Sequence, residues 1–125
     1  MNRLSNLLLK LIKVINIKAG MPTVEEAREK LFHDIEDAKK SGERFLKIIH
    51  GYGSTGVGGK LKDTVRKSLL NRKREGIIEH IIFGERFCSI YQDVENILKI
   101  YTFLRKDSDY NKKNAGITIV ILKKR

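Results

Sequence analysis

The sequence predicts a single α/β domain built on a four-stranded mixed sheet, with its elements in the order β-α-β-α-β-α-β. Short apolar runs, typical of buried strands, alternate with longer segments in which apolar residues recur at helical spacing. The length of 125 residues leaves room for one hydrophobic core and not for two. Hydrophobic residues make up 41% of the chain and charged residues 33%, as in a globular domain with a highly charged surface.

The first strand and the first helix are expected at residues 13–18 and 23–41. The strand is the apolar stretch VINI between two lysines, which suits a buried strand. Thr23 is the expected N-cap of the helix, and Glu26 three residues later completes a capping box.

The rest of the chain continues the alternation. Strands are expected at 45–49, 77–83 and 117–122, helices at 60–74 and 90–103, and a polar loop at 105–115. No linker divides the chain, so residues 13–125 are expected to form the domain and residues 1–12 an N-terminal extension. Such a sheet has right-handed crossovers and binds ligands at the carboxyl ends of its strands, where His50 and the glycine-rich segment 51–59 lie.

Positive charge is concentrated in two parts of the chain. Lysine and arginine number 26 against 15 aspartate and glutamate residues, so the net charge is +11. Residues 60–74 have seven basic residues and one acidic one, and residues 105–125 have seven and two, whereas residues 23–41 are acidic overall. This excess favours an anionic partner, nucleic acid before an acidic membrane surface.

The cysteine and histidine content excludes several kinds of site. The single Cys88 leaves no disulfide framework and no cysteine-based zinc site, so a reducing, cytoplasmic location is expected. Three histidines lack the spacing of metal ligands: His33, His50 and His80. We therefore expect neither a metal nor a cofactor. Lysines interrupt the apolar N-terminus, which argues against a signal peptide or a membrane span.

Residues 51–59, GYGSTGVGG, form the most informative segment, with five glycines in nine positions. The amides of such a loop and the amino end of the following helix can bind phosphate. Lys60 and Lys62 are expected in the first turn of that helix, where an anion site explains their placement against the helix dipole. Tyr52 would stack on bases. The residues expected to contact nucleic acid are Lys18, Gly51, Tyr52, Gly53, Gly56, Lys60, Lys62 and Arg66.

Two nucleotide-binding signatures fit this segment poorly. Its first three glycines match the dinucleotide pattern, but the acidic residue expected about 20 positions later is missing. The P-loop pattern fails because Leu61 follows Lys60 where Ser or Thr is required. A nucleotide-binding enzyme is therefore the least favoured of three functions, after a nucleic-acid-binding module and an endonuclease.

Three segments resemble signatures of the Smr (small MutS-related) domain family. In chain order they are VINIKAGMPTVEEA at 14–27, IIHGYGSTGVGGKLKDTV at 48–65 and AGITIVIL at 115–122. The resemblance implies an α/β sandwich that binds DNA or RNA, and nicking endonucleases or ribonucleases among its relatives. It also implies the ribosome or branched nucleic acid as more specific partners. Residues 84–112 are longer than the family usually has there, so an insertion is expected.

The resemblance has two departures that bear on catalysis. Asn16 and Lys18 stand where the family carries Asp and His. Asn16 cannot act as a general base, and Lys18 is a poor one unless it is strongly desolvated. His50 retains the family's His-Gly position and is the one expected catalytic residue; the alternative is a histidine that only fixes the loop. We therefore expect weak nuclease activity at most.

Overall fold

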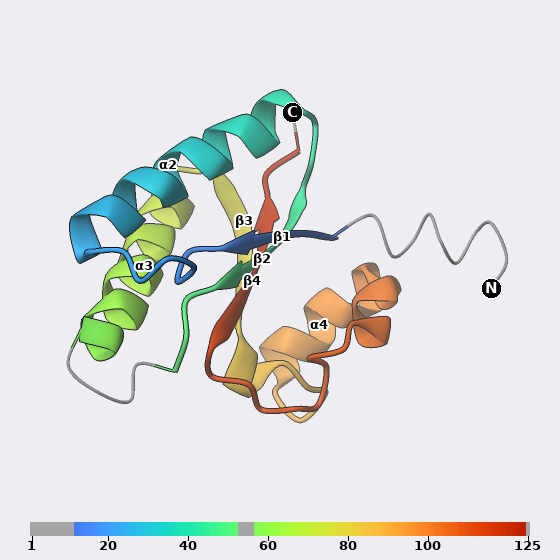
Figure 1. The fold of residues 1–125 in the computed structure, drawn as a ribbon. Coiled ribbons are helices and arrows are strands. Elements are labelled where there is room, and N and C mark those ends of the chain that lie inside the picture. The colour runs from blue at the N-terminus through green and yellow to red at the C-terminus, as the bar shows by residue number, and fades with distance from the viewer. Residues whose placement is uncertain (1–11, 53–56, 125) are drawn as a thin grey trace, which may run out of the picture.

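A four-stranded sheet lies between two helical layers in the computed structural model, which describes residues 12–52 and 57–124 (Figure 1). Its strands and helices are β1 (Ile12–Asn16), α2 (Val24–Lys40), β2 (Phe45–Ile49), α3 (Val57–Arg74), β3 (Ile78–Phe83), α4 (Gln92–Ile100) and β4 (Ile117–Leu122). Two short 3₁₀ helices, η1 (Gly84–Arg86) and η2 (Thr102–Lys106), flank α4. The predicted α/β class and the order of the strands and main helices are confirmed.

The sheet is mixed, with the strand order β1-β2-β4-β3. Strand β1 pairs with β2 in parallel, and β4 runs antiparallel to both of its neighbours, β2 and β3. Strands β1, β2 and β3 therefore point in one direction, and their carboxyl ends meet the start of β4 at a single edge. We call this the carboxyl edge of the sheet.

Helices α2 and α3 cover one face of the sheet (Figure 1). Helix α2 begins at the predicted capping box, where the Thr23 side chain accepts from the Glu26 amide and the Glu26 side chain accepts from the Thr23 amide. Leu31 and Ile35 of α2, which are at helical spacing, are fully buried against the sheet. Val65 and Leu69 of α3 are buried in the same way.

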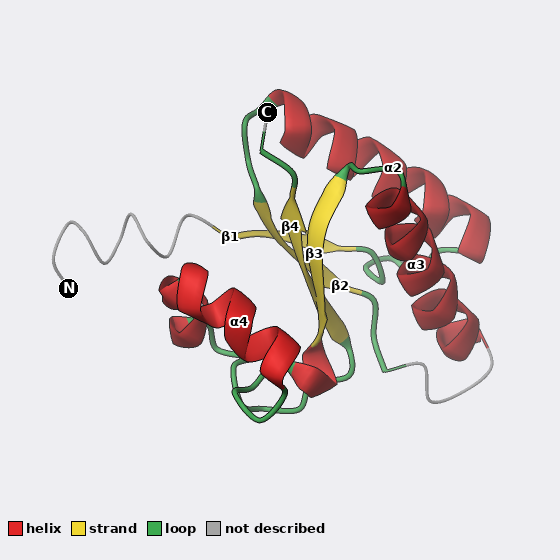
Figure 2. Ribbon diagram, turned by 180° about the vertical axis from the view of Figure 1, so that it is seen from behind, coloured by secondary structure: helices red, strands yellow, loops and turns green. Residues whose placement is uncertain are grey.

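The other face is covered by the segment between β3 and β4, which contains α4 and both 3₁₀ helices (Figure 2). The predicted helix at 90–103 is too long, because α4 ends at Ile100 and the chain leaves helical geometry at Tyr101. The Tyr101 ring then packs edge-on against Phe45 of β2, with 5.1 Å between the ring centroids. The predicted loop at 105–115 begins inside η2, whose Leu104 is fully buried.

Two other boundaries differ from the prediction by more than one residue. Helix α3 begins three residues early, at Val57, so Lys62 lies in its second turn and not in its first. Strand β1 ends at Asn16, because the Asn16 side-chain oxygen accepts from the amides of Lys18 and Ala19 and turns the chain. Across residues 12–52 and 57–124, no helix is long and apolar enough to cross a membrane.

Candidate functional site

The carboxyl edge brings together residues that are far apart in the sequence. His50 and Gly51 follow β2, Lys18 follows β1, and Thr118 lies near the start of β4. Arg66 reaches this edge from α3, where it meets Glu85 from η1. The geometry of these groups decides which of the predicted residues face a ligand.

His50 is buried at this edge, with 1% of its surface exposed. Its Nδ1 lies 2.8 Å from the carbonyl oxygen of Gly51, and its Nε2 lies 2.9 Å from the hydroxyl oxygen of Thr118. A carbonyl only accepts, so Nδ1 carries the proton and donates it to Gly51. Nε2 then accepts from the Thr118 hydroxyl, which leaves neither ring nitrogen free for a substrate.

The protonation state of His50 follows from the same surroundings. Burial, helped by the nearby charges of Arg66 and Lys62, lowers the pKa of His50 from 6.5 to about 4, against the opposing hydrogen bond to Gly51. The ring is therefore neutral at physiological pH. These contacts favour the alternative of a histidine that fixes the loop, and the catalytic role of His50 stays a prediction.

Arg66 was expected to contact phosphate, but its guanidinium group is already occupied. Only 8% of its surface is exposed. Both terminal nitrogens donate to the Glu85 carboxylate at 2.7 Å, and Nε donates to the Thr118 hydroxyl at 3.2 Å. These bonds hold the pKa of Glu85 below its usual range. Arg66 thus links α3 to the sheet in this structure, and its predicted contact with phosphate stays untested.

The amide of Gly51 is also occupied. It donates to the carbonyl oxygen of Gly116 at 3.0 Å, as does the His50 amide at 3.1 Å. Gly51 has a φ of +84°, a conformation that favours glycine, and a Cβ there would lie 3.4 Å from Cδ of Lys18. Gly51 therefore shapes the loop and lets Lys18 approach it, and its amide is bonded within the protein, so its contact with phosphate stays a prediction. Gly53 and Gly56 lie outside the described residues.

Three lysines and one tyrosine remain available at this edge. Lys18 and Lys60 are exposed, and Lys62 is half-buried close enough to His50 to influence its pKa. None of the three forms an ion pair within residues 12–52 and 57–124. Tyr52 is 62% exposed beside Gly51. These positions suit binding of phosphate by the lysines and stacking by the tyrosine.

A buried ion cluster not found from the sequence supports the edge from the α4 side. Lys47 Nζ lies 2.7 Å from carboxylate oxygens of both Asp107 and Asp109. Burial alone would lower the pKa of Lys47, but the two carboxylates raise it. Asp109 also accepts from the Asn114 amide group, whose oxygen in turn accepts from the Gly116 amide. The cluster thus orients the residue whose carbonyl holds His50 and Gly51.

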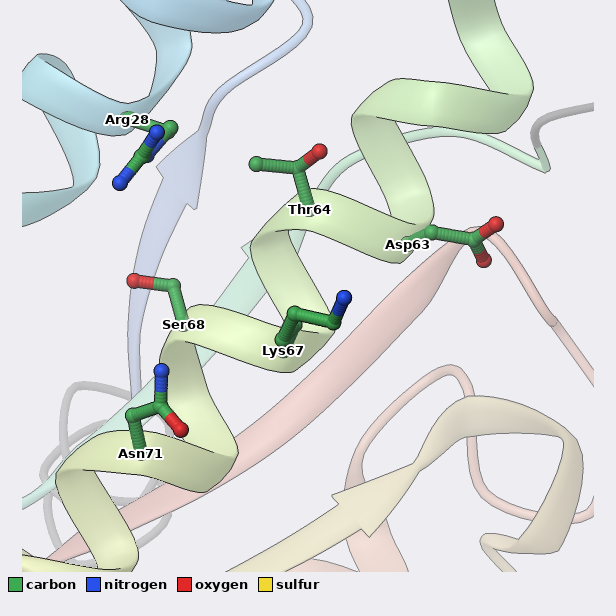
Figure 3. Close-up of a pocket in the computed structure, with 6 residues that line it drawn as sticks. All are labelled: Arg28, Asp63, Thr64, Lys67, Ser68 and Asn71. Atoms are coloured by element: carbon green, nitrogen blue, oxygen red, sulfur yellow. The ribbon is translucent and has the colours of Figure 1, made fainter.

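The outer side of α3 has a groove on each flank. One, of about 280 Å³, lies toward α2, with Arg28 facing Thr64 and Ser68 (Figure 3). The other, of about 550 Å³, is lined by α3 residues and by Phe83 at the end of β3. Among the described residues, no group of three or more His, Cys, Asp or Glu side chains is arranged to hold a metal ion.

Comparisons with known proteins show what this chain is similar to. A model of the Smr domain family matches residues 19–80. The fold is similar to the crystal structure of the Smr domain of Thermus thermophilus MutS2, with a TM-score of 0.54 and 21% sequence identity. That similarity covers 89% of this chain and 98% of the other. No curated protein matches the sequence. The resemblance expected from the three sequence segments is confirmed.

Proposed function

We propose that this chain, whose residues 19–80 match the Smr domain family, binds the phosphate backbone of DNA or RNA at the carboxyl edge of the sheet. Smr domains generally bind nucleic acids, and some members are nucleases. The observation that carries the proposal is the pair of lysines, Lys18 and Lys62, near the buried His50–Gly51 corner. Neither lysine forms an ion pair within the described residues, so both favour a phosphate ligand.

Lys60 and Tyr52 extend this surface. Lys60 lies in the first turn of α3 and is exposed, and Tyr52 presents its ring to solvent next to the loop. A lysine binds phosphate without regard to sequence, whereas an exposed ring can stack on any unpaired base. The proposed binding is therefore independent of sequence. Structured substrates such as branched nucleic acid or the ribosome are compatible with it.

We propose binding without catalysis by His50. A general base must reach the proton that it abstracts, and both nitrogens of His50 are bonded to Gly51 and Thr118. Asn16 stands at the position where the Smr family carries an acid. Its side-chain oxygen accepts hydrogen bonds from two backbone amides. In this proposal His50, the one residue predicted to be catalytic, and Asn16 both stabilise the edge.

Binding is tested by fluorescence anisotropy of labelled DNA and RNA at several salt concentrations. Lys18→Glu combined with Lys62→Glu should weaken binding and reduce the magnitude of the salt slope for duplex DNA by about 1.8, for two lost phosphate contacts. The control, Lys99→Glu with Lys106→Glu, makes the same change of charge at exposed positions of α4 and η2. Equal binding by the two double variants would refute the proposed surface.

Catalysis is tested on the same substrates. We expect intact DNA and RNA after incubation with the wild-type protein, with and without magnesium. Cleavage that disappears in a folded His50→Gln variant would overturn the structural role assigned to this histidine. Cleavage that survives in His50→Gln would instead place the chemistry on other residues.

A further inference from the structure

The groove between α3 and β3 has features that the proposed function does not use. Apart from Arg66, which is paired with Glu85, three cations of α3 line it: Lys62, Lys67 and Arg74. With a rise of about 1.5 Å per residue, they are spaced about 7.5 and 10.5 Å apart along the helix axis. The series begins at Lys62, which also belongs to the carboxyl edge, so the groove continues the proposed binding surface.

The lining of the groove is apolar between these cations. Leu70 is 39% exposed there, and Phe83 contributes its ring from the end of β3. The Arg66 guanidinium carbon lies 4.1 Å from the centroid of that ring, held in place by Glu85. Apolar and stacked surfaces of this kind can pack against the faces of bases.

We propose that this groove binds a single-stranded segment of the nucleic acid, with Lys67 and Arg74 on its phosphates and Leu70 against an unpaired base. The proposal rests on the proposed function, because the strand would enter from the carboxyl edge through Lys62. A duplex keeps its base faces inside the stack, so it could use the cations but not the apolar lining. The groove thus selects the unpaired part of a substrate.

One acidic residue opposes this charge pattern. Asp63 lines the groove one turn before Lys67, and its side chain points away from the α2 side of α3, on which Thr64 and Ser68 lie (Figure 3). It forms no ion pair within the part of the chain that the structure describes. Its carboxylate would repel a phosphate, so Asp63→Asn should tighten binding of the strand by about two- to fivefold.

The test compares an unpaired strand of about 12 nucleotides with a duplex of the same sequence, as DNA and as RNA, by fluorescence anisotropy. Lys67→Glu with Arg74→Glu should reduce single-strand affinity about tenfold or more and lower the magnitude of the salt slope by about 1.4. Leu70→Asn, at a partly exposed position, should weaken the strand about fivefold and leave the duplex unchanged. The Lys99→Glu/Lys106→Glu protein is the charge-matched control.

The outcomes separate this inference from the proposed function. Failure of the wild-type protein to bind any strand or duplex would overturn both. Wild-type binding that is weakened by Lys18→Glu/Lys62→Glu, but equal in the groove variant and the control, would overturn the groove alone. A Leu70→Asn effect of equal size on strand and duplex would overturn the assignment to unpaired bases. Weakening confined to the strand, in DNA or in RNA, supports the inference and shows which nucleic acid the groove prefers.

Discussion

Acid should destabilise this protein through His50, starting at a higher pH than the titration of an ordinary carboxylate. The folded ring has a pKa of about 4, whereas the unfolded one has its ordinary value of 6.5. Between these values the unfolded chain binds a proton that the folded chain does not, so stability falls as the pH falls. At about 1.36 kcal/mol for each pH unit, the loss reaches about 3 kcal/mol near pH 4.

The measurement is urea unfolding, followed by circular dichroism between about pH 7 and pH 4. His50→Gln has no titrating ring at this position, so its free energy of unfolding should fall by about 3 kcal/mol less than that of the wild type over this range. The pKa of His80 is also lowered by burial, but its contribution is common to both proteins and cancels in the difference.

Two results would refute this reasoning. Parallel pH profiles for the wild type and His50→Gln would show that burial does not disfavour the charged ring. A ring signal in nuclear magnetic resonance that titrates near 6.5 in the folded protein would show the same more directly. Either result would return His50 to the candidates for proton transfer at physiological pH.

Three further substitutions and one control, Lys13→Ala, test the supports of the site and the fold by urea unfolding. Lys47→Ala leaves two partly buried carboxylates without their cation and should cost about 3–5 kcal/mol, whereas Lys13→Ala removes only an exposed pair and should cost less than about 1 kcal/mol. Gly84→Ala should destabilise strongly, because its Cβ would overlap the Asn114 carbonyl oxygen; a loss below about 1 kcal/mol would show that the backbone shifts freely. Thr23→Ala should cost about 1 kcal/mol by removing the cap of α2, and an unchanged stability would mean that the capping box contributes nothing.

The sequence predicts those features that depend on neighbouring residues. The capping box lies within four residues of Thr23, and apolar runs such as FLKII at 45–49 predict the strands. Strand direction at the carboxyl edge follows from the alternation with helices, so the neighbourhood of Lys18 and His50 is predictable as well. The ends of α3 and α4 are less predictable, because they depend on tertiary contacts such as that between Tyr101 and Phe45.

The roles of the site residues depend on partners far along the chain. His50 is hydrogen-bonded to Thr118, 68 residues away, and Arg66 to Glu85, 19 residues away. No local sequence pattern predicts either pair. One signal was present for Lys47. Strand alternation places it on the same face as Phe45, and a cation in a buried position requires counter-charges, which Asp107 and Asp109 supply.

The central position of β4 also has a consequence for synthesis. This strand joins β2 to β3, yet it is the last element of the sheet to be made. The nascent chain can form its helices, but the sheet cannot close until ITIVIL at 117–122 is released. Such a segment, apolar and without charge, is prone to intermolecular β-pairing while it is free. Two lysines and an arginine follow it directly. Repulsion between these charges on different chains opposes self-association of the segment until it inserts between β2 and β3.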